Sequence, residues 1–254
     1  MLDIIQIPVL TDNYIYLIHD PISGETAAID PALAEPVLQV LNQRGWQLTY
    51  ILNTHHHGDH VGGNLELKRK TGCQIIASKA DKHRIPAIDK IVQNGDIIKL
   101  GNHSAQVIET AGHTSGHIVY YFAEDNALFC GDTLFVMGCG RLFEGSAKEL
   151  WQSLQKLKAL PPSTRVYCAH EYSLANARFA LSVEPDNLAL QEKMARIQQL
   201  RANNLPTVPS TIDEELATNP FFREDSLALQ KNLHCVGESS VTIFTLLRQK
   251  KDSF

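Results

Sequence analysis

The residues best suited to do chemistry form one short segment, Thr54-His55-His56-His57-Gly58-Asp59-His60. Four histidines and one aspartate follow soon after the apolar run 50–52. Imidazole nitrogen and carboxylate oxygen are the ligands that borderline divalent metals prefer. Residues two apart point to different faces of a helix, but to the same side of an extended chain. We therefore expect an extended strand end or a tight loop that supplies two neighbouring metal positions.

Three further candidate ligands each follow a strand-like segment. His113 comes after the alternating run 104–110, Asp132 after the apolar run 127–130, and His170 after the run 165–168. Sheets present functional groups at their edges in this way, with loops carrying the chemistry on a rigid support. These positions supply the donors that the histidine segment alone lacks.

The elements that must position these residues alternate along the first two-thirds of the chain. The pattern predicts strands over 4–9, 14–19, 26–29, 48–53, 73–77, 97–100, 104–110, 118–122, 127–130 and 165–168. It predicts helices over 36–44, from 62–64 to 70, and after the capping-box pattern Ser146-Ala147-Lys148-Glu149. After Tyr172 the strand signals fade, and helices are predicted over 174–181, 187–202, 226–233 and 239–249. The chain is therefore expected to form a mixed α/β layer domain and then a small helical domain.

The composition is that of an ordinary globular protein, with 44% hydrophobic and 20% charged residues among 254. The net charge of −5 gives no indication of binding to nucleic acid or to an anionic membrane. The five cysteines are an odd number without a CxxC pair, which indicates reduced thiols in a cytoplasmic protein. No secretory signal and no apolar run of about 20 residues is present. We expect a cytoplasmic monomer with a small-molecule partner and neither nucleic acid nor membrane.

The motifs together resemble a known superfamily. The H-x-H-x-D-H loop, the GHTSGH segment 112–117, the GDT aspartate and the late histidine are similar to those of the metallo-β-lactamases. The segments 11–14, 138–141, 169–172, 219–221 and 248–252 narrow the resemblance to the glyoxalase II, or hydroxyacylglutathione hydrolase, family. This resemblance covers essentially the whole chain. It implies an α+β fold, with a four-layer αββα sandwich as catalytic domain over 1–170 and an all-α substrate-binding domain over 171–254.

The resemblance also implies a binuclear metal site. One ion would take His55, His57 and His113. The second would take Asp59, His60 and His170, with Asp132 bridging the two. Zn²⁺ is the expected metal, with Fe²⁺ or Mn²⁺ as alternatives. Asp59 is given a second, catalytic role in orienting a hydroxide shared by the ions.

The same resemblance implies a set of glutathione contacts, which are Arg141, Phe143, Tyr172, Arg248 and Lys251. Two of them depart from the family pattern, because the family has lysine where Arg141 stands and tyrosine where Phe143 stands. Arginine keeps the charge and offers a planar fork to a carboxylate. Phenylalanine loses the hydroxyl, which puts glutathione affinity and acyl preference in question but leaves the metal chemistry untouched.

The implied activity is hydrolysis of S-D-lactoylglutathione or a related S-(2-hydroxyacyl)glutathione, the second step of methylglyoxal detoxification. A mononuclear iron glutathione-persulfide dioxygenase of the same superfamily is the first alternative, and the tail 219–251 argues against it. Phosphodiester hydrolysis is disfavoured by the acidic balance. A non-catalytic metal- or thiol-binding module is disfavoured by intact ligands at every matched position.

Several neighbouring residues have a simpler interpretation. We expect His56 to face outward and His117 to be a hydrogen-bonding residue of the core or ligand surroundings. Asp30 either supports a metal ligand or is a turn residue. Cys139 is not expected to be a nucleophile, because the shared hydroxide makes one unnecessary.

Overall fold

The structure, a computed structural model, describes all residues from 1 to 254. The chain divides into two compact units, of which the first contains residues 1–109 and 115–131. The second contains residues 110–114 and 132–254. This division differs from the expected domain boundary at 170/171, which stays a prediction. No helix is both long and apolar enough to cross a membrane.

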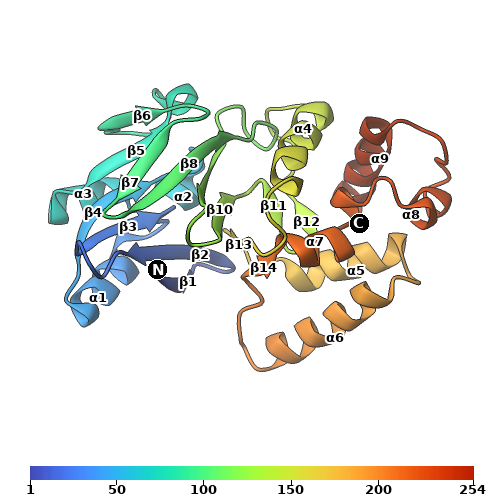
Figure 1. The fold of residues 1–254 in the computed structure, drawn as a ribbon, viewed down its shortest axis with the longest axis horizontal. Coiled ribbons are helices and arrows are strands. Elements are labelled where there is room, and N and C mark those ends of the chain that lie inside the picture. Colours follow the sequence, from blue (N-terminus) through green and yellow to red (C-terminus); the bar gives the residue numbers. More distant parts are fainter. The chain divides into compact units, whose positions relative to one another are not determined.

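The first unit contains a six-stranded sheet with the strands in sequence order (Figure 1). Its strands are β1 (Asp3–Val9), β2 (Asn13–His19), β3 (Glu25–Ile29), β4 (Gln47–Leu52), β5 (Gln74–Ser78) and β6 (Lys90–Val92). The pairs β1–β2 and β2–β3 are antiparallel, and the remaining pairs are parallel. The helices α1 (Ala34–Arg44) and α3 (Asn64–Thr71) contribute Val37, Leu41 and Leu67 to a core shared with β1, β2, β4 and β5. The short helix α2 (Gly58–Val61) precedes α3.

A second set of strands in this unit pairs antiparallel in the order β10-β9-β8-β7. These are β7 (Ile97–Leu100), β8 (His103–Glu109), β9 (Ile118–Phe122) and β10 (Ala127–Gly131). Side chains join the two sheets: the rings of Tyr16 on β2 and Phe129 on β10 lie 5.5 Å apart. Tyr120 on β9 donates its hydroxyl to the carbonyl of Asn53 at 2.8 Å. All seven residues of β2 are buried, as expected for a strand covered on both faces.

The second unit is mainly helical. It contains the hairpin of β11 (Leu134–Phe135) and β12 (Gly138–Cys139), and the antiparallel pair of β13 (Arg165–Cys168) and β14 (Ser210–Thr211). Its helices are α4 (Ala147–Lys158), α5 (Ser173–Val183), α6 (Leu188–Ala202), α7 (Ile212–Thr218), α8 (Leu227–Asn232) and α9 (Ser240–Asp252), shown in Figure 1. Phe179, Phe221 and Phe244 are buried together. The ring centroid of Phe221 lies 6.1 Å from that of Phe179 and 5.5 Å from that of Phe244. The predicted capping box at Ser146 and Glu149 is confirmed at the start of α4.

Candidate metal centre and adjoining pocket

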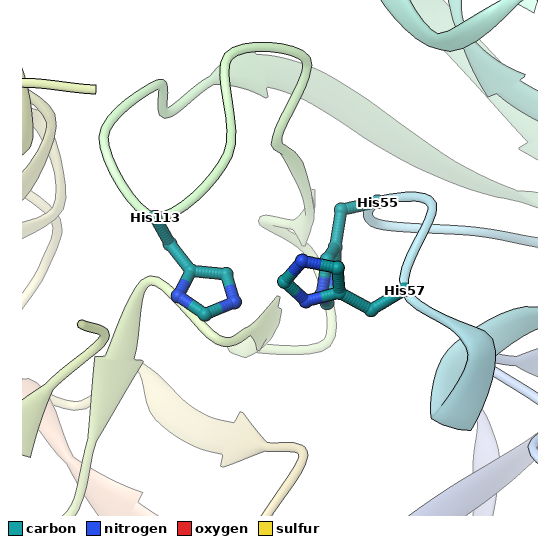
Figure 2. A group of neighbouring side chains, drawn as sticks. All are labelled: His55, His57 and His113. Carbon is teal, nitrogen blue, oxygen red and sulfur yellow. The ribbon is translucent and has the colours of Figure 1, made fainter. Parts of the chain in front are cut away.

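The histidine segment begins where β4 ends. His55 and His57 extend from the loop after this strand (Figure 2), and His55 Nε2 lies 3.0 Å from His57 Nδ1. The two residues therefore direct one nitrogen each to the same place, as the two-residue spacing predicts. Asp59 and His60 do not belong to the loop, because they lie on the single turn of α2. The expectation of a strand end or loop for the whole segment is wrong for these two residues.

Asp30 lies at the centre of this half of the site. Its Oδ1 accepts from the amide of Thr54 at 2.8 Å, and its Oδ2 accepts from the Thr54 hydroxyl at 2.6 Å. The same Oδ2 lies 3.1 Å from His60 Nδ1. Donor atoms of Asp30, His55 and His60 all lie within 4.8 Å of one another, and all three residues are buried. Asp30 thus supports a candidate ligand and also has the positive φ, 48°, of a turn residue.

Asp59 is held from a different strand. The Asn13 side chain, at the start of β2, donates to Asp59 Oδ2 at 3.0 Å and to its carbonyl at 3.3 Å. Asp59 Oδ2 also lies 3.5 Å from His60 Nε2. The hydrogen bond with His60 is the main cause that lowers the pKa of the Asp59 carboxyl from its ordinary value. Asp59 is therefore an anion beside a candidate metal ligand.

His56 and His117 complete the surroundings of the loop. His56 was expected to face outward rather than to be a ligand, and its side chain is 18% exposed. Its Nδ1 lies 3.5 Å from the fully buried carboxylate of Asp81, which also accepts from Arg84. His117 stacks on the His55 ring, with centroids 4.7 Å apart. Sequence reasoning missed Asp81 and Arg84, for which an acid and a base three residues apart were the only signal.

The second unit carries the other three predicted ligands. His113 lies in the segment between β8 and β9 (Figure 2), and its Nε2 is 3.4 Å from Asp132 Oδ2. His170 Nε2 is 3.4 Å from the other oxygen, Asp132 Oδ1. One carboxylate thus presents a different oxygen to each of two imidazoles, the arrangement that a bridging ligand requires. His113 Nδ1 lies 2.8 Å from the carbonyl of Arg141, which leaves its Nε2 available for a metal.

Two glycines allow the chain to come close to this group. Gly112 has a φ of 146°, and a Cβ there would meet Leu150 of α4 at 2.5 Å. Gly140 leaves room for Asp132 and His113, since a Cβ would overlap the Asp132 carbonyl and lie 3.0 Å from His113 Nδ1. Side chains at either position would displace the residues that hold His113.

A pocket of about 440 Å³ adjoins this group within the second unit. Eleven residues line it: His113, Asp132, Phe135, Cys139, Arg141, Phe143, Tyr172, Ala175, Asn176, Arg248 and Lys251. All five residues predicted to contact substrate are among them, although their role as contacts stays a prediction. The volume suits a small molecule.

The side chains that line the pocket differ in exposure, in their ring contacts and in protonation. Phe143 is 65% exposed and its ring lies edge-on to His113, with centroids 5.2 Å apart. Tyr172 stacks flat on His170 at 4.7 Å. Burial raises the pKa of the Cys139 thiol to about 11, so this cysteine is neutral at physiological pH. That protonation state agrees with the expectation that Cys139 is not a nucleophile.

The chain is similar to known proteins along essentially its whole length. Residues 10–170 match the metallo-beta-lactamase superfamily, and residues 171–254 match the hydroxyacylglutathione hydrolase C-terminus. A hydroxyacylglutathione hydrolase of Methylococcus capsulatus is 56% identical over 254 residues, which cover 100% of this chain and 99% of the relative. A hydroxyacylglutathione hydrolase of Rhodospirillum rubrum is 53% identical over 253 residues, which cover 100% of this chain and 99% of the relative.

The fold has counterparts among solved structures. The crystal structure of ETHE1 from Myxococcus xanthus superposes with a TM-score of 0.70 at 25% identity, covering 98% of this chain and 90% of that one. This confirms the predicted α+β metallo-β-lactamase fold, and the match at 171–254 confirms the helical C-terminal part. The chain therefore belongs to the hydroxyacylglutathione hydrolase (glyoxalase II) family of the metallo-β-lactamase superfamily.

Proposed function

We propose that this chain hydrolyses S-(2-hydroxyacyl)glutathione thioesters, S-D-lactoylglutathione in particular, to glutathione and a 2-hydroxy acid. The observation that carries the proposal is the pocket of the second unit, whose lining includes His113 and Asp132 together with the cations Arg141 and Lys251. Glutathione has two carboxylates, so a substrate bound by these cations would have its thioester beside the candidate ligands. The 56% identity to a protein named for this activity supports the same reaction. It would be the second step of methylglyoxal removal.

We propose two divalent metal ions as cofactors, with Zn²⁺ favoured and Fe²⁺ or Mn²⁺ as alternatives. One ion would be held by His55, His57 and His113, and the other by Asp59, His60 and His170. Asp132 would bridge them, which its two oxygens facing His113 and His170 support. The donor set is rich in imidazole and carboxylate, as these metals require. Bound metal ions lower the pKa of water towards 7 and polarise a carbonyl oxygen.

Residues of the chain itself would bind the substrate and orient the attacking oxygen. Arg141, Tyr172, Arg248 and Lys251 would bind the glutathione portion, and Phe143 would cover the pocket beside His113. Asp59, an anion fixed by Asn13, would orient the attacking oxygen. The leaving group is a thiolate, whose parent thiol has a pKa of about 8.5, so it departs without a strong general acid. The pocket contains no acidic side chain other than Asp132, which agrees with this.

We further propose a catalytic domain over 1–170 and a substrate-binding domain over 171–254, in a cytoplasmic monomer. The two family matches, which meet at the same residues, support the division. All five cysteines are free thiols, which supports a reducing compartment.

The test is steady-state hydrolysis of S-D-lactoylglutathione by purified protein, with bound metals quantified on the same sample. Thioester loss with near two metal ions per chain, abolished by a chelator and by His55→Ala, would establish the proposal. The control variant His234→Ala changes a histidine of the second unit that lies outside the ligand set and should hydrolyse normally. A fully metallated protein without thioester loss would refute the proposal. One iron per chain with oxygen uptake on glutathione persulfide would point to the dioxygenase instead.

A further inference from the structure

The helix α9 supplies two cations to the pocket, Arg248 and Lys251, which differ in their contacts with the rest of the protein. Arg248 is 3% exposed and already makes contacts within the protein. Its Nη1 donates to the Cys139 carbonyl at 3.0 Å, and its Nη2 donates to Asp252 Oδ1 at 2.7 Å. This guanidinium therefore helps to build the pocket wall. Lys251 is the one of these two cations that makes no ion pair within the protein.

The Lys251 ammonium group lies against two aromatic rings. Its Nζ is 5.3 Å from the centroid of Phe179 and 5.5 Å from that of Phe254. The two rings lie 5.5 Å apart at an angle of 72°, so they form two sides of a seat for the cation. Aromatic faces attract a cation at this distance through the ring quadrupole. The nearby carboxylate of Asp252 is shared between Arg248 and Arg141, and Lys251 makes no ion pair.

Burial lowers the pKa of Lys251, and the positive charges of Arg248 and Arg141 lower it further. A negatively charged ligand in the pocket would offset this repulsion. The rings meanwhile restrict a side chain that has four rotatable carbon–carbon bonds. The ammonium group is thereby held ready for a carboxylate without being neutralised by one from the protein.

The two rings differ in what else they do. Phe179 is fully buried and belongs to the aromatic core with Phe221. Phe254 is 64% exposed, and the ring contacts described for it are those to Phe179 and Lys251. A substitution at Phe254 therefore changes the seat of Lys251 without opening a cavity in the core.

We propose that Phe254 is a positioning residue for substrate binding, which with Phe179 holds the Lys251 ammonium in place to bind a carboxylate of the glutathione portion. The inference rests on the proposed thioester hydrolysis. Phe254 itself contacts no reacting atom, so its effect must pass through Lys251. It should therefore alter KM and glutathione affinity rather than kcat.

The experiment compares Phe254→Leu, which keeps apolar bulk but removes the ring, with Phe254→Tyr, which keeps the ring. Steady-state kinetics on S-D-lactoylglutathione give KM and kcat, and calorimetric titration with glutathione gives Kd without turnover. The leucine variant should raise KM and Kd about two- to fivefold at constant kcat, the loss expected for an exposed cation–π contact. The tyrosine variant should restore both values. Leu246→Ala, on the same helix and 37% exposed, is the control that should change neither.

A double-variant comparison isolates the path through Lys251. In a Lys251→Gln background, Phe254→Leu should cause no further rise in KM, because the cation is gone. A full additional rise would overturn the inference, as would an unchanged KM in Phe254→Leu with normal wild-type hydrolysis. Absence of hydrolysis by the metallated wild type would instead overturn the proposed function, and this inference with it.

Discussion

Replacing Asp30 with asparagine tests whether the support of His60 determines metal affinity. A carboxylate can only accept hydrogen bonds, so His60 Nδ1, 3.1 Å from Asp30 Oδ2, must carry the proton. In the metal-bound protein the other ring nitrogen, Nε2, would then be the atom that binds the metal. An asparagine amide at the Oδ2 position donates, which forces the His60 proton onto Nε2. If the amide is turned the other way, its NH₂ group faces the donating amide of Thr54 instead.

The expected effect is a weakening of metal binding by about 10- to 100-fold, typical of losing a partner that orients a ligand. This corresponds to about 1.4–2.8 kcal/mol. The metal-free protein should also lose stability, because Thr54 gives up hydrogen bonds to a charged acceptor, worth about 1.5–3 kcal/mol each. The two effects are separable, since only the first concerns the metal.

Competition for Zn²⁺ against a chromogenic chelator measures the affinity, and urea unfolding of the metal-free protein measures the stability. Asp125→Asn is the matched control, because Asp125 Oδ2 lies 2.7 Å from His103 Nδ1 in the same unit and His103 is not a predicted ligand. That variant should lose stability and keep its metal affinity. Wild-type metal affinity in Asp30→Asn would show that the orientation of His60 is set elsewhere.

Three further outcomes follow from contacts described above. Asp59→Asn should lose more turnover than bound metal, because Asn13 still holds the side chain while its charge is gone; equal losses of both, measured by kinetics and metal analysis, would remove its catalytic role. Phe143→Tyr should lower KM about two- to tenfold, the gain from one added hydrogen bond to glutathione, and a change confined to kcat in steady-state assays would contradict this. Ser146→Ala removes the cap of α4 and should lower the free energy of unfolding by about 1 kcal/mol in urea titration, and a stability equal to wild type would show that the cap contributes nothing.

Most long elements could be predicted because their apolar patterns are strong. The strands 97–100, 118–122 and 165–168 have the bounds expected from sequence. The elements that escaped prediction are short pieces such as α2 and β14, together with the seven-residue helix α7. The helix α2 has one turn and shows no periodicity, and β14 has two residues that are strand-like only through pairing with β13. Such elements depend on neighbours distant in sequence, which a local pattern does not contain.

The candidate site shows the same contrast between local patterns and contacts that are distant in sequence. The candidate ligands could be named from the sequence because histidine and aspartate at these spacings have few other uses. The residues that hold them could not, because their partners are far apart along the chain. Asn13 reaches Asp59 across 46 residues, and the Arg141 carbonyl reaches His113 across 28. Phe254 is close to Lys251 in sequence as well as in space. A phenylalanine three residues from a lysine is nevertheless too common to signal a role.

The contacts that hold the segment around His113 would link a supply of metal to the stability of the protein. Its segment is tied to residues beyond it: Gly145 donates its amide to the Gly112 carbonyl at 3.0 Å, and Ser153 donates to Ala111 at 2.7 Å. His113 and Asp132 therefore face each other only while these residues are folded around them. A metal that binds only the folded chain stabilises it by mass action, about 2.7 kcal/mol at one hundred times its Kd. In a metal-starved cell the chain would unfold more often, and proteases would lower its abundance before any catalytic defect appeared.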